Sequence, residues 1–146
     1  MSRLRQARQA VVGAGLFTRL EWRDRRNGRQ LDLVQDRLSA IRPRDVLLFV
    51  CLRNEQPRMP AFVDYYRGLG VGHFFVVDNG STDGFREWAA GQKDMSVWHT
   101  EASYRDSGFG MMWLNDLMRR HAVHRWCVVV DPDEFLVYPH VETRSL

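Results

Sequence analysis

Short continuous apolar runs alternate with stretches of helical periodicity over most of this chain. The runs lie at 46–51, 74–78, 95–100 and 126–131, and polar residues bound each of them. Such runs are typical of strands that are buried on both faces of a sheet. Their alternation with helices over short connections predicts an α/β fold with a mainly parallel sheet. We expect 46–51 and 126–131 to be neighbours in that sheet.

Apolar residues between these runs recur at the spacing of amphipathic helices. One helix is expected to begin near Pro60, because proline is tolerated in a first turn. Its buried face is expected to comprise Met59, Phe62, Val63 and Tyr66. A short helix is expected at 85–90, and a longer one precedes residue 126. The buried face of the longer helix is expected to comprise Met111, Leu114, Met118 and His121.

The first 44 residues have a different pattern, which predicts a basic helical arm. One helix is expected over 3–20 and a second over 31–41, ending before Pro43. The second prediction depends on the regular spacing of Leu31, Val34, Leu38 and Ile41. The chain therefore divides into an arm, 1–44, and an α/β body, 45–146. The arm is expected to pack on its own domain or a partner, or alternatively to lie on a membrane surface.

The composition of the 146 residues fits one folded domain, because 45% are hydrophobic and 12% are aromatic. Charge is unevenly distributed, since residues 1–44 hold 11 arginines and 4 acidic residues, a net +7. The rest holds 10 Lys or Arg and 14 Asp or Glu, a net −4, and the two parts sum to +3. A mildly acidic body gives no support to nucleic-acid binding.

Cys51 and Cys127 each lie in an apolar run, and we expect them to pack as unpaired thiols in a reducing compartment. No apolar run is long enough to span a bilayer. The N-terminal sequence has no convincing signal-peptide cleavage site. These features favour a cytoplasmic protein, with peripheral contact at the inner membrane through the basic arm as the alternative.

The strand expected at 126–131 ends in a pair of closely spaced carboxylates, Asp131 and Asp133. Ligands of parallel α/β sheets bind beyond the carboxyl ends of the strands. Two carboxylates at such a place repel each other unless a cation lies between them. Hard oxygen ligands suit Mg²⁺ or Mn²⁺, and such an ion would bind a diphosphate. The alternative is that one of the two aspartates only caps a turn.

Two further polar clusters follow other expected strands, so three clusters fall at one edge of the sheet. They are Arg53-Asn54-Glu55, Asp78-Asn79-Gly80-Ser81-Thr82-Asp83 and Asp131-Pro132-Asp133-Glu134. Any one of them could be ordinary turn chemistry, and Asp83 could cap the next helix. Together they predict a polar crevice with an acid pair for metal. No Gly-x-x-x-x-Gly-Lys loop is present, which excludes a P-loop kinase or ATPase.

These clusters, with Tyr65-Tyr66-Arg67-Gly68-Leu69-Gly70-Val71, match a known family in order, spacing and strand context. Residues 46–139 resemble glycosyltransferase family 2, most closely its bacterial branch with Arg-Asn-Glu, Asp-Asn-Gly-Ser-Thr-Asp and Asp-x-Asp-Glu-Phe motifs. The resemblance implies a Rossmann-like fold of GT-A type that binds a nucleotide-diphospho-sugar. It also implies metal-assisted, inverting transfer of the sugar to an acceptor, a glycan or a lipid.

The resemblance assigns roles to individual residues of this chain. The residues expected to line the nucleotide pocket are Arg53, Asn54, Glu55, Asp78 and Asn79. Asp131 would face the ribose or the metal, and Asp133 would bind Mn²⁺ or Mg²⁺. Asn115 resembles a donor-side asparagine of the family. Many family members have Asp where this chain has Asn79, so the resemblance does not identify the contact to the base.

Family members continue well past the acid pair with segments that bind the acceptor and supply the general base that an inverting transfer needs. The sequence given ends at Leu146, and Glu142 is the only carboxylate after Glu134. We therefore expect a truncated, donor-binding half without its general base. One alternative is a noncatalytic nucleotide-sugar-binding or interaction module. The other, a phospho-acceptor receiver, should have its acidic pair after the first strand, where this chain has Arg53-Asn54-Glu55.

Overall fold

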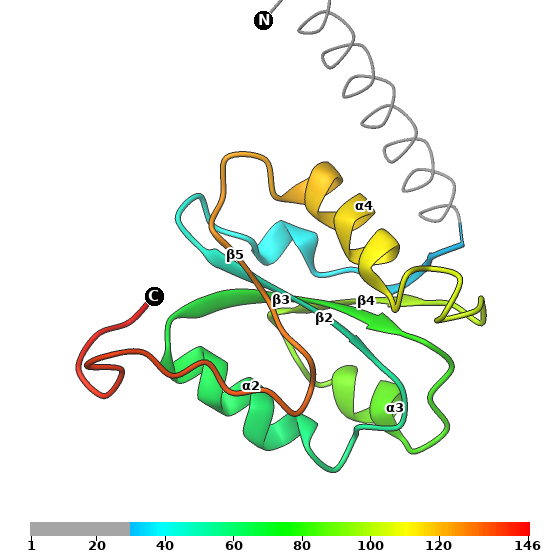
Figure 1. The fold of residues 1–146 in the computed structure, drawn as a ribbon, viewed down its shortest axis with the longest axis horizontal. Coiled ribbons are helices and arrows are strands. Elements are labelled where there is room, and N and C mark those ends of the chain that lie inside the picture. Colours follow the sequence, from blue (N-terminus) through cyan, green and yellow to red (C-terminus); the bar gives the residue numbers. More distant parts are fainter. Residues whose placement is uncertain (1–29) are drawn as a thin grey trace, which may run out of the picture.

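The computed structural model describes residues 30–146 of the chain, and five strands in this part form one mixed sheet (Figure 1). The strands are β1 (Asp32–Gln35), β2 (Val46–Leu52), β3 (Val71–Asp78), β4 (Met95–His99) and β5 (Cys127–Val129). Their order across the sheet is β1-β4-β3-β2-β5. Strands β2 to β5 run parallel to one another, and β1 is antiparallel to β4. This confirms the α/β class, the mainly parallel sheet and the adjacency of β2 and β5.

Helices cover both faces of the sheet. The helices are α2 (Met59–Gly68), α3 (Phe85–Ala89) and α4 (Met111–His121), with a 3-10 turn, η1 (Leu38–Ala40). α2 and α3 lie on one face, whereas α4 and η1 lie on the other (Figure 1). This three-layer arrangement is consistent with a Rossmann-like fold. Among residues 30–146, no helix has both the length and the apolar character needed to cross a membrane.

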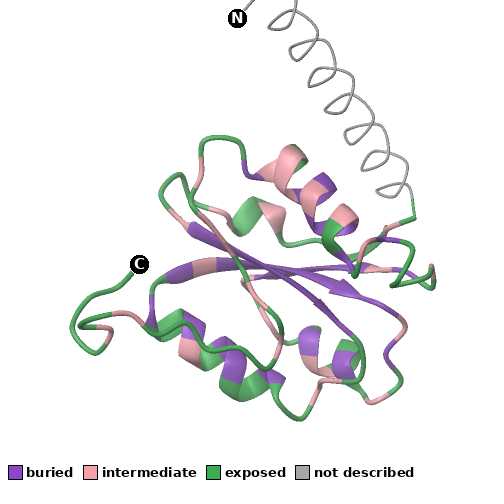
Figure 2. Cartoon of the chain, in the orientation of Figure 1, coloured by how far each residue is buried: buried purple, intermediate pink, exposed green. Residues whose placement is uncertain are grey.

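Strand β2 is the centre of the core, because every one of its residues is buried (Figure 2). Its side chains alternate between the two faces, as the pleat of a strand requires. Leu48 and Val50 pack with α2 and α3, whereas Leu47 and Phe49 pack with α4. A strand covered on both faces needs apolar residues at every position, which explains its continuous apolar run.

The two longer helices differ in how well their periodicity predicted the buried face. On α2 the four expected residues, Met59, Phe62, Val63 and Tyr66, are all buried. On α4 the fully buried residues are Trp113, Leu114, Asp116 and Leu117, so of the expected face Leu114 is buried and Met118 packs against the core with partial exposure. Met111 is exposed, and Met118 and His121 are only partly buried. The observed face buries the indole of Trp113, and aromatic side chains remove the largest apolar area from water.

The helix expected over 31–41 was wrong, because Asp32–Gln35 forms the edge strand β1. Its register on β4 pairs Asp32 with His99, and only Leu38–Ala40 is helical, as a 3-10 turn. The Gln35 amide donates to the carbonyl oxygens of Ala89 (2.9 Å) and Met95 (2.9 Å). These partners are more than 50 residues away, so local periodicity could not reveal them. The other expected helix, over 3–20, lies outside the described residues.

A histidine is fully buried at the centre of the sheet. His73 of β3 has its Nε2 atom 3.0 Å from the Ser96 hydroxyl, which also accepts a hydrogen bond from the Arg37 backbone N–H (3.1 Å). Its Nδ1 atom has no hydrogen-bond partner in the part of the chain described. Burial, the largest cause, lowers the pKa of His73 from 6.5 to about 4, and nearby carboxylates only partly oppose this effect.

We expect acid to destabilise the fold through His73. In the unfolded chain the imidazole takes up a proton as the pH falls through 6.5, whereas in the folded chain it stays neutral down to about pH 4. The free energy of unfolding should therefore be fully present above pH 6.5 and fall between pH 6.5 and 4 by an amount on the order of 3 kcal/mol. Urea unfolding at several pH values would measure it. A His73→Gln variant is the control, and an equally steep pH dependence in that variant would contradict the assignment.

Candidate functional site

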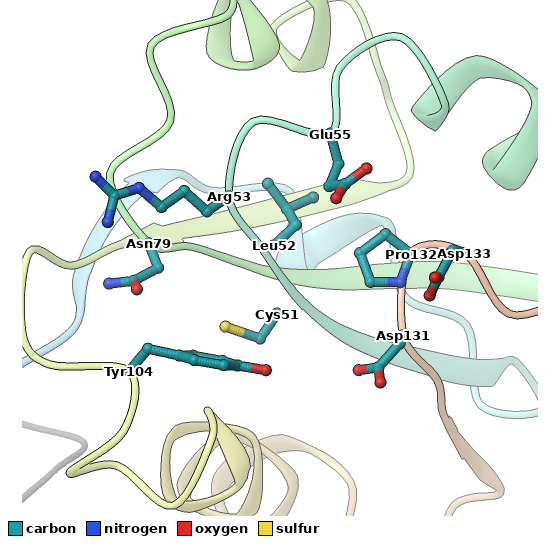
Figure 3. Close-up of a pocket in the computed structure, with 9 residues that line it drawn as sticks. All are labelled: Cys51, Leu52, Arg53, Glu55, Asn79, Tyr104, Asp131, Pro132 and Asp133. Carbon is teal, nitrogen blue, oxygen red and sulfur yellow. The ribbon is translucent and has the colours of Figure 1, made fainter.

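A cavity of about 350 Å³ opens at the carboxyl ends of β2, β3 and β5. The residues that line it are Cys51, Leu52, Arg53, Glu55, Asn79, Tyr104, Asp131, Pro132 and Asp133 (Figure 3). The chain runs from β2 to β3 on one side and later places β5 on the other side of β2. Such a reversal of strand order leaves a crevice between the exit loops, where α/β proteins bind ligands.

The acid pair stands in a short turn directly after β5. The Val130 backbone N–H still donates to the Phe49 carbonyl oxygen (3.3 Å), and the chain then leaves the sheet. The turn is closed in both directions: Glu134 N–H donates to the Asp131 carbonyl oxygen (3.0 Å), and Asp131 N–H donates to the Glu134 carboxylate (3.1 Å). Asp131 and Asp133 therefore lie at the cavity on a turn whose backbone is defined by hydrogen bonds.

The donor set at this turn fits a divalent cation only in part. Asp131 and Asp133 are exposed, and neither forms an ion pair with a residue of the described range. Residues 30–146 contain no group of three His, Cys, Asp or Glu side chains placed to hold a metal. Mg²⁺ is usually bound by one or two carboxylates, with phosphate and water as further ligands. The turn therefore suits a cation that arrives with a phosphate-bearing ligand.

Asn79 offers the cavity an acceptor and no donor. The residue is only 6% exposed, and its amide nitrogen donates to the carbonyl oxygens of Thr100 (3.1 Å) and Ala102 (3.0 Å). Both amide hydrogens are thus used to hold the loop after β4. Only the side-chain oxygen remains for a ligand, so the matching ligand atom must be an N–H or O–H donor.

A second, more polar cavity of about 480 Å³ adjoins the first. Its lining comprises Arg53, Asn79, Gly80, Thr82, Glu101, Ala102, Ser103 and Tyr104. Three of these residues, Arg53, Asn79 and Tyr104, also line the first cavity. An extended ligand could therefore contact both cavities. Its negatively charged part would lie near Asp131, bridged by a cation, and a polar part would lie near the loop after β4.

Asn54 joins the exit loops of β2 and β3 and does not line either cavity. Its backbone N–H donates to the Ser81 hydroxyl (2.9 Å), and its side-chain oxygen accepts from the Thr82 backbone N–H (2.8 Å). Its φ of 58° lies in the left-handed region, where asparagine is among the best-tolerated residues. Gln56 N–H adds a bond to the Asp83 carboxylate (2.7 Å), which also accepts from Phe85 N–H (3.1 Å) at the start of α3.

Asp78 lies beneath these loops, fully buried, and is not a lining residue of either cavity. One carboxylate oxygen accepts from the Ser81 backbone N–H (2.8 Å). The other lies 3.3 Å from Arg86 Nε and 3.5 Å from His99 Nδ1. Through these contacts, Asp78 holds the β3 exit loop against α3 and the end of β4.

Asn115, which the resemblance assigned to the donor side, and Glu142, which was assigned no role, both lie outside the cavity. Asn115 is partly buried on α4 and does not line it, and Glu142 is exposed in the segment after the acid pair. The structure therefore brings five of the expected residues together, namely Arg53, Glu55, Asn79, Asp131 and Asp133. It does not bring Asn54, Asp78 or Asn115 to the cavity surface.

Cys51 and Tyr104 form a part of the cavity that sequence reasoning missed. Both cysteines are free, as expected, but Cys51 lines the cavity. Burial, followed by the charge of Asp131, raises the pKa of the Cys51 thiol to about 12, so it stays protonated. Figure 3 shows the Tyr104 hydroxyl and the Asp131 carboxylate pointing toward each other across the cavity. Cys51 could have been inferred from its place at the end of the apolar run, two residues before Arg53, whereas nothing in the sequence marked Tyr104.

Gly110 allows the loop before α4 to pack closely against this wall. A Cβ atom there would lie 3.0 Å from both Cβ and Sγ of Cys51, and Gly110 has a φ of +79°. We expect Gly110→Ala to lower the free energy of unfolding by about 2–3 kcal/mol, because strain and overlap add. Gly108→Ala is the matched control, since φ is +65° there but the nearest atom is 3.5 Å away. Equal losses in urea unfolding would show that the contact with Cys51 has no cost.

Comparison of the chain with known protein families, with curated proteins and with solved structures gave no match. The functional conclusion therefore depends on the chemistry of the cavity itself. That chemistry includes two carboxylates that have no ion-pair partner among residues 30–146, one exposed arginine and one amide oxygen. It suits a ligand that combines negative charge, bridged to the protein through a cation, with hydroxyl or N–H donors.

Proposed function

We propose that this protein binds a nucleotide-diphospho-sugar through a divalent cation at Asp131 and Asp133, as a glycosyltransferase of family 2 type. The observation that carries the proposal is the acid pair without ion-pair partners in residues 30–146, at the crevice between β2 and β5. The order and spacing of the three polar clusters support it, as does a mostly parallel sheet, which suits a GT-A type fold.

Each cavity has its own part in this proposal. Asp133 and Asp131 would hold Mn²⁺ or Mg²⁺, which neutralises charge on the departing diphosphate. Arg53, at the border of both cavities, would add positive charge beside the phosphates. The second cavity would take the nucleoside, whose donor groups the Asn79 oxygen can accept.

Glu55 is the one described carboxylate besides the acid pair that lines the first cavity. It is bound to Arg58, with 2.5 Å between Oε2 and Nη1, so we assign it no role as a general base. This observation favours the second candidate function, a noncatalytic nucleotide-sugar-binding module. Release of uridine diphosphate (UDP) from UDP-glucose, UDP-galactose or UDP-N-acetylglucosamine with Mn²⁺ would support the enzyme. Binding of these donors without release would support the module.

Calorimetric titration of UDP into the chain tests donor binding directly. We expect clearly tighter binding with Mn²⁺ or Mg²⁺ than with a chelator, because the cation supplies the attraction between two sets of negative groups. Asp32→Ala is a matched control for carboxylate changes, since Asp32 is exposed on the edge strand β1, at the opposite edge from β5. Equal affinity with and without metal would refute the proposed role of the acid pair.

A further inference from the structure

The turn that carries the acid pair is held at two ends by different parts of the fold. On one side it continues from β5, which is only three residues long and pairs with β2 alone. On the other side the chain crosses to the helical layer and runs along α2 (Figure 1). Because Asp133 is exposed and has no ion-pair partner among the described residues, its position depends on these two attachments.

Two consecutive tyrosines of α2 make the second attachment. The Tyr66 hydroxyl donates to the Glu134 carbonyl oxygen (3.1 Å) and accepts from the Leu136 backbone N–H (3.1 Å). The Tyr65 hydroxyl donates to the Leu136 carbonyl oxygen (2.7 Å). The two hydroxyls thus bind three backbone groups of Glu134 and Leu136. The first of these groups belongs to the residue next to Asp133.

Packing makes this attachment rigid. Tyr66 is fully buried, and burial, the largest cause, raises the pKa of its hydroxyl above 10.0, so the proton needed for donation is retained. Between the two bound residues, the Phe135 ring meets Tyr65 edge-on at 4.9 Å and Phe62 at 6.4 Å. The segment is therefore fixed both by its backbone and by an aromatic side chain.

We infer that Tyr65 and Tyr66 are positioning residues that set the Asp131 and Asp133 carboxylates at the cavity for the cation. The inference rests on the proposed function and adds residues that touch neither cavity. Groups that orient metal ligands from behind typically change metal affinity about 10- to 100-fold when they are removed. Loss of the Tyr66 hydroxyl leaves both Glu134 C=O and Leu136 N–H without this partner, so Tyr66 should matter more than Tyr65.

The test compares Tyr66→Phe, Tyr65→Phe and a control, Tyr138→Phe, in the full chain. Tyr138 also donates to a backbone carbonyl oxygen, that of Arg144 (2.5 Å). This bond lies outside the turn that carries Asp131 and Asp133, so its loss should not move the acid pair. Titration of UDP with Mn²⁺ should give about tenfold weaker binding in Tyr66→Phe and a smaller loss in Tyr65→Phe. Binding of UDP in chelator should be the same in all four proteins. Unchanged Mn²⁺-dependent affinity in Tyr66→Phe, or an equal loss in Tyr138→Phe, would overturn the inference.

Amide hydrogen exchange without ligand gives a second readout that does not depend on nucleotide binding. Residues 131–136 should exchange faster in Tyr66→Phe than in the wild type, whereas β2 and β3 should be unchanged. A wild type with no metal-dependent affinity for UDP would refute the proposed function. The exchange result would then test only whether Tyr65 and Tyr66 hold the turn that carries Asp131 and Asp133. Unaltered exchange at 131–136 in both Tyr66→Phe and Tyr65→Phe would show that the tyrosines do not hold the turn that carries the acid pair.

Discussion

Asp133→Ala is expected to abolish most of the metal dependence of UDP binding. With Asp133 removed, the ligands left for the cation are Asp131, phosphate oxygens and water, so the protein supplies one carboxylate ligand where it had two. We expect the affinity measured with Mn²⁺ to fall at least about tenfold, toward the value measured with chelator. Calorimetry with Mn²⁺ and with chelator measures both quantities on the same protein.

Two controls separate this effect from a simple change of charge or fold. Asp32→Ala removes the same charge at the opposite sheet edge and should leave the Mn²⁺ dependence intact. Asp133→Asn keeps the size of the side chain but replaces a carboxylate with a much weaker cation ligand, so it should resemble Asp133→Ala. Tight, metal-dependent binding by both Asp133 variants would remove Asp133 from the site.

Asp78→Ala is expected to cause the largest loss of stability. The change would leave Ser81 N–H, Arg86 and His99 facing a buried position without their carboxylate. Breaking a buried charged contact by removing one partner typically costs about 3–5 kcal/mol. The Arg86 side chain is partly exposed, and we therefore expect a loss nearer 3 kcal/mol in urea unfolding.

Asp78→Asn separates the structural role of Asp78 from the nucleotide contact implied by the family resemblance. Its side-chain oxygen can still accept from Ser81 N–H, so it should be more stable than Asp78→Ala. If Asp78 only holds the loop, UDP affinity should follow the stability of the two variants. Normal stability of Asp78→Ala combined with lost UDP binding would instead make Asp78 a nucleotide contact.

Local pattern predicted those parts of the fold whose environment is the same along a whole element. β2 is buried throughout, and α2 buries one regular stripe, so hydrophobic periodicity alone revealed both. Parallel strands bring their carboxyl ends to one edge, which predicted that Arg53, Asn79 and Asp131 lie together, and all three line the cavity. These inferences needed no knowledge of which loop meets which.

The missed features all depend on contacts between distant segments. The apolar spacing around β1 predicted a helix, because local spacing does not reveal strand partners such as Trp98 and Met95, which are far away in the sequence. Tyr104 reaches the cavity from a loop whose path is set by Gly110 and by Asn79. Asp78 stands in a motif that resembles a ligand contact, but the residue after it, Asn79, reaches the cavity instead. Sequence pattern thus located the site and left its individual contacts open.

The bonds of Asn54 and Gln56 to Ser81, Thr82 and Asp83 have a consequence for the thermodynamics of recognition. They join the two exit loops in the protein without any ligand, so the conformational entropy of these segments is lost during folding and not during binding. Ligand ordering of loops ordinarily subtracts from affinity. A ligand that docks here should therefore show a small entropic penalty from the protein and fast association that is not limited by loop rearrangement.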